Sequence, residues 1–254
     1  MSDLAANAKP TTGTQKSKTY VLLHGAWHGA WCWQKITPGL QAAGHRVYTP
    51  TQTGLGERSH LLNAGVGLET FVQDLLNVLI WEDLSDVILV GHSFGGLAIT
   101  AAADRMPERL KHLVYLDALI LQNGQSPFSI VPNEVAESRR ALAKQSPSGL
   151  TIPVPSADKL GVTDAQDAAW LAAKCTPHPI KTYEDTLALA HEPGNGLPVT
   201  YLAVTPHYAP TEACRTYARS RASHGHWTYD ELPAGHDAML TSPQALIEKL
   251  LNIK

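Results

Sequence analysis

The sequence DVILVGHSFGG occupies residues 86–96 and combines a strand pattern with a serine flanked by glycines. Val87 to Val90 are four consecutive apolar residues, three of them β-branched, and this pattern predicts a strand buried on both faces. Residues 97–103, LAITAAA, favour a helix after the serine. The Gly-x-Ser-x-Gly motif of residues 91–95 therefore lies between a strand and a helix, a context that holds a nucleophilic serine, Ser93, on a sharp turn at the top of a sheet.

Strand and helix patterns alternate along most of the chain. Further strands are expected at residues 20–23, 46–49, 110–116, 199–204 and 227–232. Helical spacing is expected at residues 33–43, 68–81, 211–221 and 243–251. This alternation predicts an α/β fold with a mostly parallel sheet flanked by helices.

The domain organisation follows from composition. Residues 1–18 are polar and predict a flexible N-terminal tail, whereas residues 19–117 and 198–254 form the expected α/β core. Residues 118–197 contain prolines at 127, 132, 147, 153, 155, 177, 179 and 193, which break the segment into short helical pieces such as 134–144 and 164–174. This segment is expected to be an inserted cap.

The overall composition limits the expected binding partners and the expected cellular location. Apolar residues make up 44% of the chain and charged residues 17%, with a net charge of −3 and no basic run, so neither nucleic acid nor membrane is an expected partner. Cys32, Cys175 and Cys214 lack metal-ligand spacing and are expected to be free thiols in a reducing compartment. Without an apolar signal or membrane-length run, a soluble cytoplasmic protein is expected. The sequence suggests no metal, cofactor or oligomeric state.

Four stretches carry a recognisable resemblance: residues 21–31, 43–47, 91–96 and 234–240. Through them the sequence resembles the α/β-hydrolases, and within that fold the branch of plant methyl esterases and hydroxynitrile lyases with their bacterial esterase relatives. Residues 49–61, TPTQTGLGERSHL, look like a marker of the bacterial relatives, and a loop packed under the active site is the expected role.

A serine hydrolase of this fold needs a base and an oxyanion hole. His236 follows the last expected strand and can take the proton of Ser93, in the chain order of serine, acid, histidine. The backbone N–H of Phe94 is one expected oxyanion donor, and by resemblance the other is that of Ala26. Gly25 lets the backbone approach closely, while Trp27 either lines the substrate pocket or packs beneath the cap.

The acid of the triad departs from the plant relatives. Those enzymes carry an aspartate after the strand that corresponds to residues 199–204, but here the sequence Thr-Pro-His-Tyr of residues 205–208 stands there. Asp117, at the end of the preceding expected strand, is the predicted acid, because strand ends of a parallel sheet face one crevice. Glu212, Asp230 and Asp237 remain alternatives.

The resemblance leaves more than one chemistry open. The plant lyases have a lysine after the catalytic histidine and a threonine in place of Gly25, whereas this chain has Asp237 and Gly25. The sequence therefore favours a carboxylesterase-type serine hydrolase that cleaves small to medium apolar esters, including carbamate or xenobiotic esters, through an acyl-enzyme on Ser93. The alternatives are a C–C lyase resembling the hydroxynitrile lyases and a non-catalytic small-ligand-binding homologue.

Overall fold

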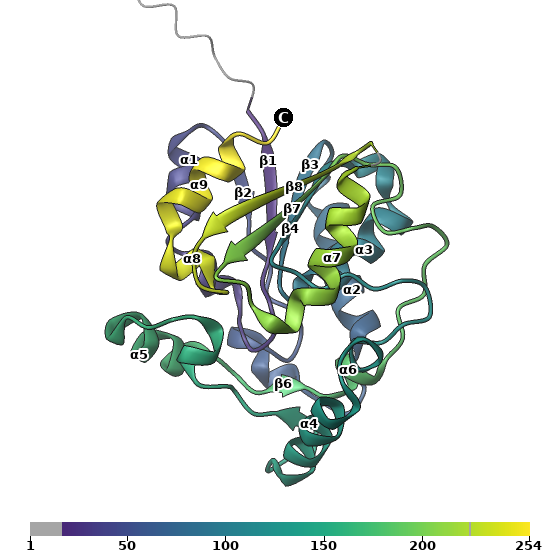
Figure 1. Cartoon of the computed structure of the whole chain (residues 1–254), viewed down its shortest axis with the longest axis vertical. Coiled ribbons are helices and arrows are strands. Elements are labelled where there is room, and N and C mark those ends of the chain that lie inside the picture. Colours follow the sequence, from purple (N-terminus) through teal and green to yellow (C-terminus); the bar gives the residue numbers. More distant parts are fainter. Residues whose placement is uncertain (1–16, 224) are drawn as a thin grey trace, which may run out of the picture.

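A parallel sheet organises the molecule. The computed structural model describes residues 17–223 and 225–254, and these residues form a six-stranded sheet of order β2-β1-β3-β4-β7-β8, in which every adjacent pair is parallel (Figure 1). The predicted α/β fold is thus confirmed. Its strands are β1 Thr19–Leu23, β2 Arg46–Tyr48, β3 Val87–His92, β4 Leu110–Leu116, β7 Val199–Thr205 and β8 Trp227–Pro233.

Helices cover both faces of the sheet. In Figure 1, α1 (Thr37–Ala42), α8 (Ala238–Thr241) and α9 (Pro243–Leu251) lie on one side, with α2 (Leu68–Trp81), α3 (Gly95–Arg105) and α7 (Glu212–Ala222) on the other. The apolar stripe of α2 explains its attachment, since its members are buried while Glu69, Gln73 and Asn77 are exposed. These members are Leu68, Phe71, Val72, Leu75, Leu76 and Leu79.

One predicted helix is shorter in the structure. Within the predicted range of residues 33–43, Trp33 ends the 3-10 turn Ala30–Trp33, residues 34–36 form a turn, and α1 starts only at Thr37. Pro38 lies in the first turn of α1, where its missing N–H is tolerated because no carbonyl within the helix would bind it there.

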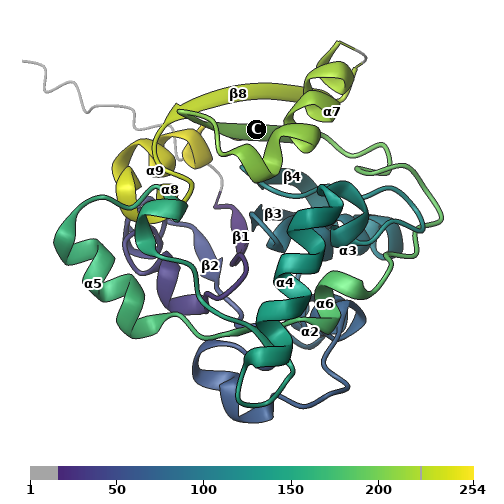
Figure 2. The same ribbon diagram turned by 60° about the horizontal axis from the view of Figure 1, so that its bottom comes forward.

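Residues between β4 and β7 gather beyond one end of the sheet. This segment contains α4 (Asn133–Gln145), α5 (Ala165–Lys174), α6 (Lys181–Glu184) and an antiparallel pair, β5 (Thr151–Ile152) with β6 (His178–Pro179). It lies below the core in Figure 1, and Figure 2 brings α4 and α5 to the front. The cap boundaries stay a prediction.

The remaining sequence-based expectations concern the tail and the thiols. Most of the predicted tail, residues 1–18, lies outside the described residues; Ser17 Oγ donates to the carbonyl of Gly44 at 2.7 Å. Cys32, Cys175 and Cys214 are free thiols. Among residues 17–223 and 225–254, no helix is long and apolar enough to span a membrane.

Candidate active site

The nucleophile turn joins β3 to α3. Ser93 has a φ of +51°, in the left-handed region that is strained for a residue with a Cβ. A Cβ on Gly95 would lie only 2.7 Å from the carbonyl oxygen of His24, so the turn can pack against the loop after β1 only because glycine stands there. The motif therefore fixes both the position of the serine and its distance from that loop.

Three side chains from separate strand ends form one hydrogen-bonded array. His236 Nε2 lies 2.9 Å from Ser93 Oγ, and His236 Nδ1 lies 2.7 Å from Asp117 Oδ2. Asp117 follows β4 and is fully buried, while His236 follows β8 and is almost fully buried. The array has the connectivity of a Ser-His-Asp triad, in which the carboxylate orients the imidazole.

The alternative acids are engaged elsewhere. Glu212 hydrogen-bonds to Arg215, Asp230 Oδ2 lies 2.6 Å from Lys249 Nζ, and Asp237 Oδ2 lies 3.0 Å from His28 Nε2. Within the described residues, Asp117 is the carboxylate that the structure brings to the His236 side chain.

Buried polar partners surround the second oxygen of Asp117. Thr211 Oγ1 donates to Asp117 Oδ1 at 2.9 Å, and Arg215 Nη1 lies 3.7 Å from the same oxygen. Arg215 is itself 1% exposed and donates to Thr211 Oγ1 and to the carbonyl of Tyr208, both at 2.7 Å. Such partners offset the desolvation of a buried carboxylate. Sequence analysis missed Thr211 and Arg215, although their i,i+4 spacing would place them on one helix face.

Tyr208 occupies the region where the plant relatives carry their acid. Its ring stacks on the imidazole of His236, with a centroid distance of 3.7 Å and an interplanar angle of 20°. This contact restricts rotation of the imidazole and shields one of its faces from water. No local pattern points to Tyr208, because the stacking depends on two segments that meet only in the fold.

The loop after β1 presents the second expected oxyanion donor. The carbonyl of Ala26 accepts a hydrogen bond from His28 Nδ1 at 2.7 Å, and the N–H of Trp27, in the same peptide unit, donates to His178 Nδ1 at 3.2 Å. Both ends of this peptide are therefore held by imidazoles. Neither Ala26 nor Phe94 donates its N–H to another group within the described part of the chain, which leaves both available.

Trp27 connects this loop to the segment above it. Its φ is +66°, its indole N–H donates to the carbonyl of Ile152 at 3.3 Å, and its own carbonyl accepts from Thr176 N at 2.9 Å. The side chain also lines the cavity at Ser93. Trp27 therefore both lines the cavity at Ser93 and packs beneath the segment between β4 and β7, the two roles that the sequence left as alternatives.

The marker loop of residues 49–61 supports the same region from below. Gln52 N donates to His24 Nε2 at 3.0 Å, and Ala30 N donates to Thr51 Oγ1 at 2.8 Å. His24 Nδ1 donates to the carbonyl of Gly25 at 2.8 Å, and burial lowers the pKa of His24 to about 3, which keeps the imidazole neutral. A neutral ring can donate at one nitrogen and accept at the other, as this arrangement requires.

A buried ionic network lies behind His236. Burial alone would lower the pKa of His28, but the carboxylate of Asp237 raises it above its ordinary value; the pKa of Asp237 is lowered because His28 outweighs the effect of burial. His92 Nε2 donates to the carbonyl of His236 at 3.0 Å. The His28–Asp237 pair and His92 together fix the main chain that carries the imidazole of His236.

The same cluster is the place to test for a metal site. His92, His236 and Asp237 offer ligand atoms within 4.8 Å of one another. Both nitrogens of His236 already contact Ser93 and Asp117, and Asp237 Oδ2 is bound to His28. The cluster therefore fits a hydrogen-bond network better than a metal centre.

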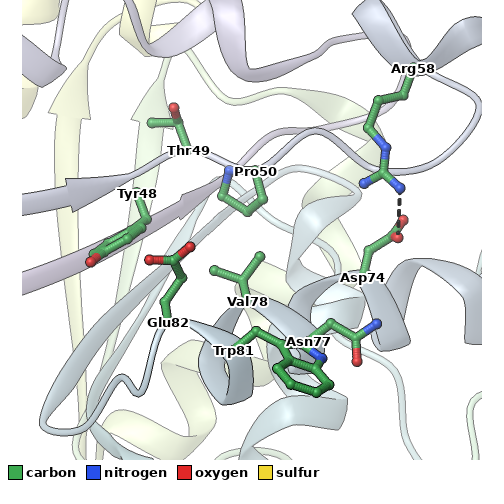
Figure 3. A pocket seen from close by; sticks show the side chains of 9 residues that line it. All are labelled: Tyr48, Thr49, Pro50, Arg58, Asp74, Asn77, Val78, Trp81 and Glu82. Carbon is green, nitrogen blue, oxygen red and sulfur yellow. Dashed lines mark ion pairs between the residues drawn. The ribbon is translucent and has the colours of Figure 1, made fainter.

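Two cavities adjoin the nucleophile. The inner one, about 30 Å³, is lined by Ser93, Phe94, Leu119, Val131, Tyr183 and other residues, and the outer groove, about 710 Å³, runs along α4 and residues 152–159. They share Trp27, Arg139, Tyr208 and Pro210, so the groove lies next to the inner cavity. Another hollow, between β2 and α2, contains the Arg58–Asp74 ion pair and none of the three array residues (Figure 3).

Gly25 separates this site from that expected of the plant lyases. A Cβ there would lie 2.8 Å from Ser93 Cβ and 2.9 Å from His92 Nδ1. Since such distances require neighbours to move, a threonine does not fit beside this serine without rearrangement.

Comparison with known proteins agrees with this geometry. A model of the alpha/beta hydrolase family matches residues 20–249. The chain therefore belongs to the alpha/beta hydrolase family. It is 38% identical over 239 residues to the carbendazim hydrolyzing esterase of Nocardioides sp. strain SG-4G, which covers 91% of this chain and 97% of that protein.

Plant proteins match over shorter stretches. Methylesterase 2 of Arabidopsis thaliana is 34% identical over 126 residues, 49% of this chain and 48% of that protein. The alpha-hydroxynitrile lyase of the same plant is 35% identical over 118 residues, 46% of each chain. The resemblance to the methyl esterase and hydroxynitrile lyase branch is confirmed.

A solved structure is similar over nearly the whole chain. It is an extracellular alpha/beta-hydrolase from a Paenibacillus species, described as sharing structural and functional homology with tobacco salicylic acid binding protein 2. The TM-score is 0.78 at 27% identity, covering 92% of this chain and 98% of that one. The predicted enzyme class is confirmed, since relatives are named esterase and methylesterase: the protein is a carboxylesterase-type hydrolase.

Replacing Asp117 with asparagine tests the array. An amide can no longer accept from His236 Nδ1–H as an anion and can favour the wrong tautomer, so kcat should fall by about 10⁴-fold with KM little changed. Turnover of one chromogenic ester, with folding checked by circular dichroism, measures this. Asp230→Asn is the matched control and should retain near-normal kcat; a large loss there, or in Glu212→Gln, with Asp117→Asn active, would contradict the assignment.

His178→Ala tests whether the segment above the site positions the oxyanion donor. Burial keeps the pKa of His178 well below its ordinary value, so the neutral ring accepts from Trp27 N, and its loss should loosen the Ala26–Trp27 peptide that directly follows the N–H of Ala26. Losing one oxyanion donor outright costs about 10² to 10³ in kcat, so a loosened donor should cost about 10-fold. His191→Ala, at a side chain 55% exposed, is the control. A change in KM alone would assign His178 to substrate binding.

Proposed function

We propose that this chain hydrolyses small to medium carboxylic esters with apolar bodies, including methyl carbamates, through a covalent acyl-enzyme on Ser93. The observation that carries the proposal is the hydrogen bond from Ser93 Oγ to His236 Nε2, 2.9 Å long, at the base of a cavity lined by aromatic side chains. The carbamate part rests on the similarity to a carbendazim hydrolyzing esterase.

Acylation moves a proton from Ser93 to His236, while Asp117 stays ionised. His236 takes the proton of Ser93 as Oγ attacks the ester carbonyl, and Asp117 stabilises the imidazolium that results. Negative charge develops on the carbonyl oxygen, where the N–H groups of Ala26 and Phe94 can bind it. The imidazolium then protonates the departing alcohol, and an acyl group, or a carbamoyl group from a carbamate, stays on Ser93.

Deacylation repeats the steps with water as the nucleophile. His236 removes a proton from water, the oxyanion forms again in the same place, and Ser93 leaves with its proton restored. The ring of Tyr208 covers one face of His236, so water approaches the imidazole at its Nε2 edge beside Ser93.

Cavity size suggests how a substrate is divided. The inner cavity of about 30 Å³ exceeds the roughly 10–15 Å³ that one water molecule needs, whereas the outer groove of about 710 Å³ has room for a drug-sized body. A small group such as a methoxy leaving group fits the inner cavity, and the larger part of the ester fits the groove.

A covalent probe tests the nucleophile. A fluorophosphonate should label Ser93 stoichiometrically and abolish ester turnover, because an activated serine forms a stable phosphonyl adduct. Mass spectrometry of the labelled peptide identifies the site, with Ser93→Ala as the matched control. Labelling that persists in Ser93→Ala, or full activity after labelling, would defeat the proposal.

The lyase alternative makes an opposite forecast. A hydroxynitrile lyase needs a cation to stabilise departing cyanide, yet the residue after His236 is Asp237, a buried carboxylate paired with His28. Cyanide release from mandelonitrile should therefore be at least about 100-fold slower than turnover of a chromogenic ester, a margin of the size that one electrostatic donor supplies. Rates of equal size would support the lyase instead.

A further inference from the structure

The outer groove carries positive charge that the sequence does not reveal. Arg139, from α4, lines both cavities, and Lys159, from the 3-10 turn Ala157–Leu160, lines the groove. The side chains of the described residues that line these two cavities include no aspartate or glutamate. The whole chain has a net charge of −3, so this local excess of cations is a property of the site and not of the composition.

Arg139 differs from its neighbour Arg140 in its partners. Arg140 Nη1 lies 2.7 Å from Glu137 Oε1, and its Nε lies 3.5 Å from Glu184. Arg139 is half-buried with its guanidinium over the ring of Tyr183, 4.9 Å from the centroid, and no carboxylate of the described residues forms an ion pair with it. A partly desolvated cation without a counterion is costly unless an anion arrives from outside.

The position of Arg139 suggests what that anion is attached to. Arg139 lines the inner cavity together with Ser93. It also lines the groove, where Trp27 and Tyr208 are its neighbours in the wall. A ligand whose ester carbonyl reaches Ser93 would therefore lie in a cavity whose wall combines aromatic side chains with this guanidinium. The planar guanidinium fork matches a carboxylate, which it can bind through two parallel hydrogen bonds.

We propose that the preferred substrates are monoanionic esters, in which an apolar body separates the scissile ester at Ser93 from a carboxylate that pairs with Arg139. This inference rests on the proposed esterase function and adds a charge requirement to it. Lys159, which is exposed at the mouth, attracts the same anion from further away. The expectation of purely apolar substrates then holds for the body of the ester and not for its far end.

A matched pair of esters tests the proposal. The first is the monomethyl ester of a dicarboxylic acid, from adipic to sebacic acid, and the second is the same methyl ester with its far carboxyl converted to an amide; methanol release measures the turnover of both. At low ionic strength the wild-type protein should favour the carboxylate ester in kcat/KM by about 10-fold or more at the chain length that spans the two groups. A charge-assisted hydrogen bond contributes a factor of about 10 to 100.

Variants assign the preference to one residue. Arg139→Gln should lower the carboxylate-to-amide ratio of kcat/KM by about 10- to 100-fold, Arg139→Lys should retain part of it, and Arg140→Gln, the matched control, should leave it unchanged. If Arg139→Gln fails to fold, the carboxylate-to-amide ratio of kcat/KM in the wild-type protein and in Arg139→Lys still tests the charge requirement.

The outcomes separate the two proposals. Hydrolysis of both esters with a wild-type ratio near one at every length, or a ratio that Arg139→Gln leaves intact, overturns the charge requirement while the esterase function stands. Failure to hydrolyse either ester, with Ser93 unlabelled by the fluorophosphonate, overturns both.

Discussion

The hydrogen bond between Asp117 and His236 imposes the strictest demand on this fold. It needs a fully buried carboxylate to lie 2.7 Å from an imidazole that belongs to a different strand end. Burying a charge is expensive unless partners replace its water, and here Thr211 and Arg215 from the start of α7 supply them. The ends of β4 and β8 and the first turn of α7 are thereby constrained to one arrangement. The triad acid can lie at the end of β4 because the carboxyl ends of neighbouring parallel strands face the same crevice.

A frame of buried histidines surrounds the nucleophile, each held in one protonation state by its surroundings. Burial lowers the pKa of His24, His92 and His178, so each of these rings can accept at one nitrogen while donating at the other. His28 is the exception, because Asp237 raises its pKa and both of its nitrogens face acceptors. Fixed hydrogen-bond roles of this kind preorganise the backbone that faces the developing charge.

Much of this arrangement could be read from the sequence where the signal is local. The bounds of α2, β4 and α9 match their prediction because each is a strongly periodic or continuously apolar segment. Ser93, His236 and Asp117 were predicted from a turn motif, chain order and a strand end, and the structure brings them together. The predicted helix at residues 33–43 was wrong at its start, since residues 34–36 form a turn between the 3-10 turn Ala30–Trp33 and α1.

The residues that sequence analysis missed act across long separations. Tyr208, His178 and Arg139 each gain their role from a segment more than 25 residues away, and no local pattern distinguishes them from ordinary surface or core residues. Two of the three lie in the segment between β4 and β7, whose many prolines obscure any helical period.

The attachment of Trp27 has a consequence for how relatives of this enzyme could exchange parts. Its backbone N–H, backbone carbonyl and indole are all bound by residues of the segment between β4 and β7, namely His178, Thr176 and Ile152. A chimaera that receives a foreign segment for altered selectivity would lose the His178 side chain, and it would keep the main-chain contacts of Thr176 and Ile152 only where the new backbone follows the same path. A functional exchange would need to transfer the strand pair β5 and β6 together with the loop that carries Trp27. A change of substrate selectivity through this segment would therefore also change the turnover rate.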